Sequence, residues 1–545
     1  MRTTLALIAL LLLDCTSNAQ SVKKYFIAFK DKTGSIYSTA NPQQYLTQRA
    51  INRRAKYSIA ITTQDLPVND SYVQQVKSVG VAIAGQSKWL NGVIVSTNDP
   101  SKITTITQLP FVVSSTDVLR KSNVASDKFA DATQYTQRSS QLYDSTYYGA
   151  DAPAIRQLNL SPLHNQGYTG ANTLIAVLDA GFPNVNTLAA FDSINQQSKI
   201  IYTYDVVLNQ PNVYSYNGHG TAVLSCITGN IPNSFVGTGF GATFALLRTE
   251  DAPTENIVEE YYWVIGAEKA DSIGADIITS SLGYTAFDTP TQNHTYANMN
   301  GSTAVCSKTA TIATHKGIVV CVAAGNEGQN PWQYISAPAD ADSICTVGAV
   351  TTQGIRAGFS SVGPTADGRT KPTVMANGAG KALVDEFGNI TNANGTSFAC
   401  PTLAGAMACL FQKHPTLTPM QLIEAVQLSA TLAQSPNNQY GWGIPNFGLA
   451  SFLLSDTNNK TIIENKIYGS IATENTLVLY FIKSKDAQLT ITLLDMNGKI
   501  MLQKNSVINT QYDEITLPIN NVIPSGAYLV RISGNNSTTT LRVIK

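Results

Sequence analysis

The sequence predicts an α/β protein whose largest domain has a parallel β-sheet covered by helices on both faces. Apolar strand-like runs recur between residues 149 and 455, among them "TLIAVLD", "ATFALLRTE", "ADIITSSLG", "GIVVCVAAGN" and "ICTVGAV". Helical segments separate these runs, and continuous apolar strands that alternate with helices are typical of a parallel sheet buried on both faces. A chain of 545 residues also exceeds a single hydrophobic core, so we expect further domains on either side.

The N-terminus has the pattern of a secretory signal peptide over residues 1–19. Arg2 supplies a positive charge, residues 5–13 are apolar, and small residues precede the expected cut after Ala19. A lipoprotein anchored through Cys15 is the weaker alternative, because an acidic residue precedes it where a small one is expected. No later run reaches the roughly 18 apolar residues of a membrane-spanning helix. We therefore expect an exported protein.

Residues 20–120 have the pattern of a small ferredoxin-like α+β domain. Strand patterns ("KKYFIAFKD", "VAIAG", "LNGVIVS", "FVVSSTDV") and two helical ones ("DSYVQQVKSVG", "PSKITTITQLP") follow the order β-α-β-β-α-β. A further amphipathic segment, "PQQYLTQRAINRRAK", is inserted after the first strand. Residues 121–148 are polar and Ser-rich without periodicity, which predicts a linker in which the chain is cleaved.

The C-terminal part of the chain has the pattern of a small antiparallel β-sandwich. Residues 456–465 are polar and predict a linker. Residues 466–545 contain alternating strands, two of which flank an Asn497-Gly498 turn. We therefore expect a β-domain after the α/β domain, which itself spans residues 149–455.

The composition excludes some classes of partner but does not decide whether the cysteines form disulfides. Lys plus Arg equals Asp plus Glu at 36 each, so a nucleic acid or an anionic membrane surface is not an expected partner. Six cysteines remain after the signal peptide: Cys226, Cys306, Cys321, Cys345, Cys400 and Cys409. An even number suits disulfides in an oxidising compartment. However, Cys321 and Cys345 lie in apolar runs, where unpaired buried thiols are an equally good interpretation. No cysteine spacing predicts zinc.

Three residue types associated with nucleophilic catalysis occur at strand or helix ends of the α/β domain. Asp179 ends "TLIAVLD", His219 lies in "NGHGTAVLSCI", and Ser397 lies in "NGTSFACPTLAGAMA". Each alone has a structural interpretation, as a turn residue, a polar surface group or a helix cap. Ligands of parallel sheets bind at the carboxyl ends of the strands, which adds Ser281 and Asn326 as candidates.

The order Asp, His, Ser and the strings around these residues resemble the subtilisin-like serine peptidases. "GHGTAV", "NGTSFACP", "ADIITSSLG" and "VAAGNEG" carry the resemblance, which spans residues 150–450. It implies hydrolysis of peptide bonds through an acyl-enzyme, with Ser397 as the nucleophile and His219 as the general base. Asp179 would orient His219, and Asn326 would bind the oxyanion together with the backbone N–H of Ser397.

The same resemblance implies a pocket for the substrate residue that precedes the cut bond. Its expected walls are Ser281, Leu282, Gly283, Ala323, Ala324 and Gly325, with Ser336 near its floor. These residues are small and uncharged, and no acidic residue is evident among them. We therefore expect broad specificity for uncharged residues at this position and no strict preference for Lys or Arg. No cofactor is expected for the chemistry. Many relatives hold calcium, but no Asp-rich loop predicts it here.

The flanking domains fit a secreted zymogen. Residues 20–120 resemble the propeptide of this family, which acts as an intramolecular inhibitor. The last domain, with "LLDMNGK" and "SGAYLVRI", resembles the C-terminal sorting domain of Bacteroidetes type IX secretion cargo. We therefore expect a monomer that is exported through the periplasm and acts on proteins or peptides, secreted or at the cell surface. The natural substrate remains open.

Two other functions can be weighed against a peptidase. One is a catalytically silent surface protein that binds through its last domain, and an intact triad argues against it. The other is a lipase or esterase of the α/β-hydrolase type. That class requires G-x-S-x-G and the order Ser, acid, His, and this sequence has neither.

Overall fold

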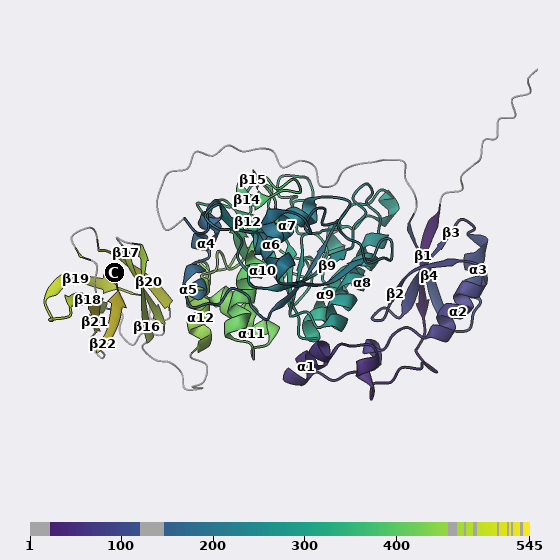
Figure 1. Ribbon diagram of the computed structural model, residues 1–545, viewed down its shortest axis with the longest axis horizontal. Helices are drawn as coiled ribbons and strands as arrows, with labels where there is room; N and C mark the ends of the chain where they lie inside the picture. The colour runs from purple at the N-terminus through teal and green to yellow at the C-terminus, as the bar shows by residue number, and fades with distance from the viewer. Residues whose placement is uncertain are drawn as a thin grey trace, which may run out of the picture. The chain divides into compact units, whose positions relative to one another are not determined.

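The computed structural model describes residues 22–119, 146–455 and, in the C-terminal domain, 466–473, 476–482, 488–508, 512–519, 523–524, 527–534 and 538–544 (Figure 1). The expected signal peptide, almost all of the expected linker at 121–148 and the whole of that at 456–465 lie outside the described residues. The chain divides into two compact units, one up to residue 455 and one formed by the C-terminal strands.

The N-terminal region is a four-stranded antiparallel sheet with two helices on one face. Its elements are β1 (Lys23–Phe29), α2 (Asp70–Ser78), β2 (Ala82–Ser87), β3 (Gly92–Thr97), α3 (Ser101–Thr107) and β4 (Val112–Leu119). The sheet order is β2-β3-β1-β4, as in the predicted ferredoxin-like fold. Ile27, Val93 and Val95 face Val76 and Ile106 of the two helices in one apolar cluster.

The other face of this sheet packs on the α/β domain. Side chains alternate between the two faces of a strand, so Phe26 and Ile94 point away from α2 and α3. They contact Tyr261 and Ile265 of α8 (Val258–Ile273). The N-terminal region is therefore bound through its open face to a helix of the α/β domain.

The inserted segment forms α1 (Gln48–Lys56), which adds a buried ionic contact to the same interface. Arg53 and Arg54 of α1 donate to Asp271 Oδ1 of α8 at 2.6 and 2.8 Å. Lys88, from the loop between β2 and β3, donates to Asp271 Oδ2 at 2.7 Å. Burial alone would raise the pKa of Asp271, but Lys88, Arg53 and Arg54 outweigh it and hold the pKa well below its usual range.

The α/β domain is built on a seven-stranded parallel sheet in the order β13-β12-β11-β10-β5-β9-β6. The strands are β5 (Leu174–Asp179), β6 (Ile200–Asp205), β9 (Thr243–Arg248), β10 (Ile277–Ser280), β11 (Val319–Ala323), β12 (Cys345–Val350) and β13 (Val374–Asn377). The strand patterns of the sequence thus correspond to real neighbours in one sheet.

Helices cover both faces of this sheet, as the sequence predicts (Figure 1). Ile175 and Val177 of β5 face α7 (His219–Thr228) and α10 (Thr396–Lys413), whereas Leu174, Ala176 and Leu178 face α8 and α9 (Val305–His315). Both sets are fully buried, which explains why the strand sequence is apolar at every position.

Shorter elements complete the α/β domain. They are α4 (Ala152–Gln157), α5 (Ser161–His164), α6 (Asp192–Gln196), α11 (Pro419–Leu428), α12 (Phe447–Ser455) and the hairpins β7 (Asn230–Ile231) with β8 (Phe235–Val236) and β14 (Lys381–Val384) with β15 (Ile390–Ala393). All six cysteines of this domain are buried and free, including Cys321 and Cys345 on neighbouring strands. Among the described residues, no helix is long and apolar enough to cross a membrane.

The C-terminal unit has two antiparallel sheets. One has the order β16-β17-β20 and the other β19-β18-β21-β22. The strands are β16 (Lys466–Thr473), β17 (Thr476–Ile482), β18 (Gln488–Asp495), β19 (Ile500–Val507), β20 (Tyr512–Pro518), β21 (Ala527–Ser533) and β22 (Thr538–Ile544). Leu479, Ile491, Leu517 and Val530 from both sheets share one core, which is the predicted sandwich arrangement.

Candidate active site

Asp179 and His219 form a hydrogen-bonded pair at the carboxyl edge of the sheet. Asp179 is the last residue of β5, an interior strand between β10 and β9, and its side chain is fully buried. His219 is the first residue of α7, and its Nδ1 lies 2.8 Å from Asp179 Oδ1. Asp179 Oδ1 also accepts a hydrogen bond from the backbone N–H of Ala180 at 2.8 Å. The carboxylate can thus fix the orientation of the imidazole.

The residue after His219 is Gly220, and the close contacts around it leave no room for a side chain. A Cβ atom at Gly220 would lie 2.2 Å from the carbonyl oxygen of Gly181 and 3.0 Å from Asp179 Cβ. Any side chain there would push the start of α7 away from the end of β5. The missing Cβ therefore allows the helix to approach the strand closely enough for the Asp179–His219 contact.

Ser397 is the second residue of α10, and this helix is buried from Thr396 to Phe411. The helix N-cap is Gly395, which offers no side chain, so Ser397 does not cap the helix. Instead its Oγ donates to the backbone carbonyl of Ser281 at 3.4 Å, and Ser281 Oγ donates to the carbonyl of Ser397 at 2.7 Å. Ser397 is 8% exposed, so its hydroxyl is accessible from the cavity described below.

The imidazole of His219 and the hydroxyl of Ser397 come from neighbouring helices. α7 and α10 pack against each other on one face of the sheet, and the ring of His219 lies 5.8 Å from the ring of Phe398, the residue after Ser397. Three segments that are far apart in the sequence thus bring Asp179, His219 and Ser397 to one edge of the sheet.

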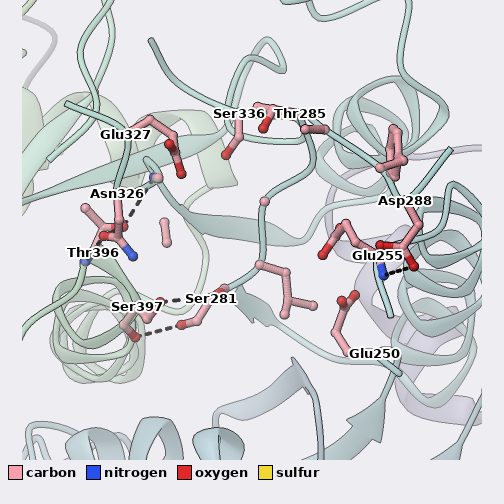
Figure 2. A pocket seen from close by; sticks show the side chains of 16 residues that line it. Glu250, Glu255, Ser281, Thr285, Asp288, Asn326, Glu327, Ser336, Thr396 and Ser397 are labelled. Carbon is pink, nitrogen blue, oxygen red and sulfur yellow. Dashed lines mark hydrogen bonds between the residues drawn. The ribbon is translucent and has the colours of Figure 1, made fainter. Parts of the chain in front are cut away.

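Asn326 lies in the loop after β11 and is held by Thr396. Its Oδ1 accepts hydrogen bonds from the backbone N–H and the hydroxyl of Thr396, at 2.9 and 3.0 Å. Because the amide oxygen is engaged with Thr396, the amide nitrogen is available on the side of the cavity (Figure 2). Asn326 and the start of α10 therefore present N–H donors close to Ser397.

A cavity of about 450 Å³ opens beside Ser397 and Asn326. Most of the predicted pocket residues line it, namely Ser281, Leu282, Gly283, Ala323, Gly325 and Ser336. Ala324 does not, because it is fully buried in the apolar cluster between the sheet, α8 and α9. Ser336 lies close to both Gly283 and Gly325. A Cβ atom added at Gly283 would be 2.2 Å from Ser336 Oγ, and one added at Gly325 would be 3.1 Å from it.

The cavity extends beyond the predicted pocket residues and includes four carboxylates that the sequence analysis did not place there. Glu250, Glu255, Asp288 and Glu327 also line it (Figure 2). Sequence reasoning missed these four carboxylates because they belong to loops whose proximity depends on tertiary packing. Two signals were present, however: Glu327 directly follows Asn326, and Glu250 follows β9, the strand beside β5.

The described residues offer no constellation for a metal ion. Within residues 22–119, 146–455 and the described C-terminal strands, no three His, Cys, Asp or Glu side chains are arranged to hold one.

Comparison with known proteins assigns each part of the chain. The model of the subtilase family matches residues 170–443. The Bacteroidota propeptide domain of peptidase family S8 matches residues 24–137, and the secretion system C-terminal sorting domain matches residues 473–545.

Several characterised relatives are similar over the α/β domain. Subtilisin from Bacillus pumilus is 34% identical over 54% of this chain and 97% of its own length. Subtilisin NAT from Bacillus subtilis subsp. natto is 32% identical over 56% of this chain and 72% of its own length. A crystal structure of MycP1 without its N-terminal propeptide aligns with 55% of this chain and 96% of its own, at 22% identity and a TM-score of 0.44.

These matches define a serine-type endopeptidase that is made with a propeptide and a sorting domain for export to the cell surface or beyond. The chain belongs to the subtilase family.

Proposed function

We propose that the chain hydrolyses peptide bonds with Asp179, His219 and Ser397 as its catalytic triad. The observation that carries this proposal is the 2.8 Å contact between the buried Asp179 carboxylate and His219 Nδ1, with Ser397 on the adjacent helix. A serine hydroxyl is a poor nucleophile at neutral pH, so it requires a base oriented in this manner.

The reaction has two stages. Ser397 Oγ attacks the carbonyl carbon of the peptide bond while His219 Nε2 takes the hydroxyl proton. His219 then gives this proton to the leaving nitrogen, the C–N bond breaks, and an ester with Ser397 remains. In the second stage His219 takes a proton from water, the hydroxide attacks the ester, and the proton returns to Ser397 Oγ. Asp179 stabilises the imidazolium in both stages.

The oxyanion of each tetrahedral intermediate would bind to Asn326 and to the start of α10. The Asn326 amide is oriented by Thr396, so its N–H donor is in place before the substrate arrives. The backbone N–H of Ser397 is at the positive end of the α10 dipole. Donors fixed in this way require little reorganisation when the negative charge develops.

We also propose that residues 20–120 inhibit the enzyme until they are cleaved off within residues 121–148. The sheet of this region covers α8, and Arg53, Arg54 and Lys88 neutralise Asp271 in a buried contact. Such a contact orders the two parts in one arrangement, because each charge would be buried without a partner if the parts shifted.

Labelling with a fluorophosphonate tests this function. We expect the mature, folded protein to be labelled at Ser397 and the matched variant Ser397→Ala to remain unlabelled. Mass spectrometry of the labelled peptide identifies the serine. A folded mature protein in which Ser397 is not labelled would contradict the triad and favour a silent surface protein.

A further inference from the structure

A buried ion pair that the proposed reaction does not use joins Asp151 to Lys381. Lys381 Nζ donates to Asp151 Oδ1 at 2.5 Å and to the backbone carbonyl of Ala382 at 2.7 Å. Neither charged side chain is more than 1% exposed. The remaining carboxylate oxygen, Asp151 Oδ2, accepts no hydrogen bond from the residues that the structure describes. Each charge therefore has the other as its counter-charge.

Asp151 belongs to an N-terminal segment of the α/β domain, residues 147–151, which directly precedes α4. Gly149 forms an antiparallel bridge with Phe235 of β8. A Cβ atom added at Gly149 would lie 2.1 Å from the carbonyl oxygen of Ser234, so the segment approaches the chain before β8 as closely as a glycine allows. The N-terminal segment is thus held against the β7–β8 hairpin, and this hairpin directly follows α7.

Lys381 is the first residue of β14, which pairs with β15, the strand that precedes Ser397. In the register of the two strands Lys381 lies opposite Ala393. Beside this position, the N–H of Gly380 donates to Asn394 Oδ1 at 2.8 Å. Ser397 follows four residues after Ala393, in the first turn of α10. The position of β14 therefore determines where the chain enters the helix that carries Ser397.

β14 also contacts the helix that carries His219. β14 and α7 pack against each other (Figure 1). The N–H of Val384 at the end of β14 donates to Ser225 Oγ of α7 at 2.9 Å. The buried ion pair therefore links the N-terminal segment to both helices of the proposed active site, to α7 through the β7–β8 hairpin and to α10 through β14 and β15.

A buried ion pair constrains position more than it stabilises the fold. The loss of hydration of the two charges offsets much of their attraction, so apolar side chains of similar size are often equally stabilising. Once the pair is buried, however, neither charge can move away without leaving the other unpaired in an apolar environment. The pair therefore opposes any shift of β14 relative to the N-terminal segment.

We infer that Asp151 and Lys381 are positioning residues for Ser397, because their ion pair fixes the start of α10 relative to α7. This inference rests on the proposed function, since it takes Ser397 as the nucleophile and His219 as its base. These two groups must meet within hydrogen-bond reach, and a displacement of about 1 Å lowers such a rate by about 100-fold. Cleavage within residues 121–148 retains Asp151 in the mature chain, as this role requires.

The test removes both charges together, in the double variant Asp151→Leu, Lys381→Met. We expect the mature double variant to remain folded, with a kcat about 10- to 100-fold lower than that of the wild type and an unchanged KM on a neutral peptide. The kcat is expressed per active site that a fluorophosphonate labels, so a smaller folded fraction does not lower it. Urea unfolding measures the stability of each preparation.

Two further variants complete the test. Lys381→Arg keeps the ion pair and changes its geometry, so its kcat should lie between those of the wild type and the double variant. Lys371→Met is the matched control. Lys371 is also buried, and it donates to Thr346 Oγ1 at 2.8 Å, outside β14 and the N-terminal segment. This control should keep the wild-type kcat.

The two hypotheses fail in different ways. If Ser397 of the wild-type enzyme is labelled and the folded variants of the ion pair keep the wild-type kcat, the positioning role is overturned while the peptidase stands. The same conclusion follows if neither variant folds, because the pair would then serve folding, or if the control loses as much kcat as the double variant. Lys381→Arg decides the question if only the double variant fails to fold. If Ser397 of the wild-type enzyme is not labelled and no peptide is cut, both hypotheses are overturned.

Discussion

Asp179 Oδ1 lies 2.8 Å from His219 Nδ1, although 40 residues of sequence separate these two residues. The carboxylate is fully buried, so the hydrogen bond is protected from competing water. The bond occupies Nδ1 of the imidazole, which leaves Nε2 as the nitrogen that can accept a proton from a nucleophile. The pair thus fixes both the orientation and the tautomer that the proposed reaction needs.

Asp179→Asn should lower kcat of the mature enzyme by about 10⁴-fold, with a small effect on stability. An amide at this position favours the wrong imidazole tautomer and cannot stabilise the imidazolium. The measurement is kcat on a neutral peptide substrate. The exposed control Asp367→Asn should keep wild-type activity, and a fully active Asp179→Asn enzyme would exclude the triad.

Ser397→Ala should lower kcat by on the order of 10⁶-fold. It should also leave the precursor uncleaved when no other protease is present, because no nucleophile remains. Intact mass and N-terminal sequencing of the purified protein provide the measurement. Normal processing of this variant in a protease-free preparation would mean that another enzyme removes the propeptide.

Asn326→Ala should lower kcat by on the order of 10²–10³-fold and change KM little, because the amide donor would act mainly on the oxyanion. Thr396→Val should have a smaller effect in the same direction, since it removes the hydroxyl that donates to Asn326 Oδ1 at 3.0 Å but keeps the backbone contact. Steady-state kinetics on one peptide compare the two variants. Equal losses in kcat and in affinity would point to a binding role instead.

Asp271→Asn should destabilise the precursor much more than the mature domain. In the precursor the change leaves Arg53, Arg54 and Lys88 in a buried site without their shared carboxylate, a loss of about 3–5 kcal/mol in the free energy of unfolding. These cations all belong to the propeptide, so the mature domain lacks them. Urea unfolding in a Ser397→Ala background measures both forms. An equal loss of unfolding free energy in the precursor and in the mature domain would contradict the contact of Asp271 with the propeptide.

Acid should destabilise the α/β domain through His164. Burial lowers the pKa of His164 to about 4, and its Nε2 lies 3.0 Å from the carbonyl oxygen of Thr238 while Nδ1 lies 2.9 Å from the hydroxyl of Tyr148. The unfolded chain takes up this proton near pH 6.5 and the folded one only near 4. The free energy of unfolding should therefore fall by about 3 kcal/mol as the pH falls from 6.5 to 4, and the contribution should level off below that.

Urea unfolding of the Ser397→Ala protein at several pH values between 7 and 4 measures this effect. The matched variant His164→Gln carries no titratable group at the site, so its stability should change less over the same range. An identical pH profile in both proteins would assign the acid sensitivity to other groups.

The class of fold and the candidate triad could be predicted from local features of the sequence. Strand patterns, the "GHGTAV" and "NGTSFACP" strings and the order of Asp179, His219 and Ser397 are local features, and each depends on a short stretch of chain. The buried strands of the parallel sheet are apolar at every position, so their residues are recognisable without the structure. The ferredoxin-like region and the C-terminal sandwich could be predicted for the same reason.

The electrostatic contacts between charged side chains depend on tertiary packing and could not be predicted from the sequence. Asp271 meets Arg53 and Arg54 across more than 200 residues of sequence, and Glu255, Asp288 and Glu327 reach one cavity from separate loops. Likewise, Ala324 follows a predicted pocket residue but faces the core. Loop conformation and helix packing bring such side chains together or apart, and no local pattern encodes these distances. For this reason the sequence does not reveal which carboxylates line the cavity beside Ser397.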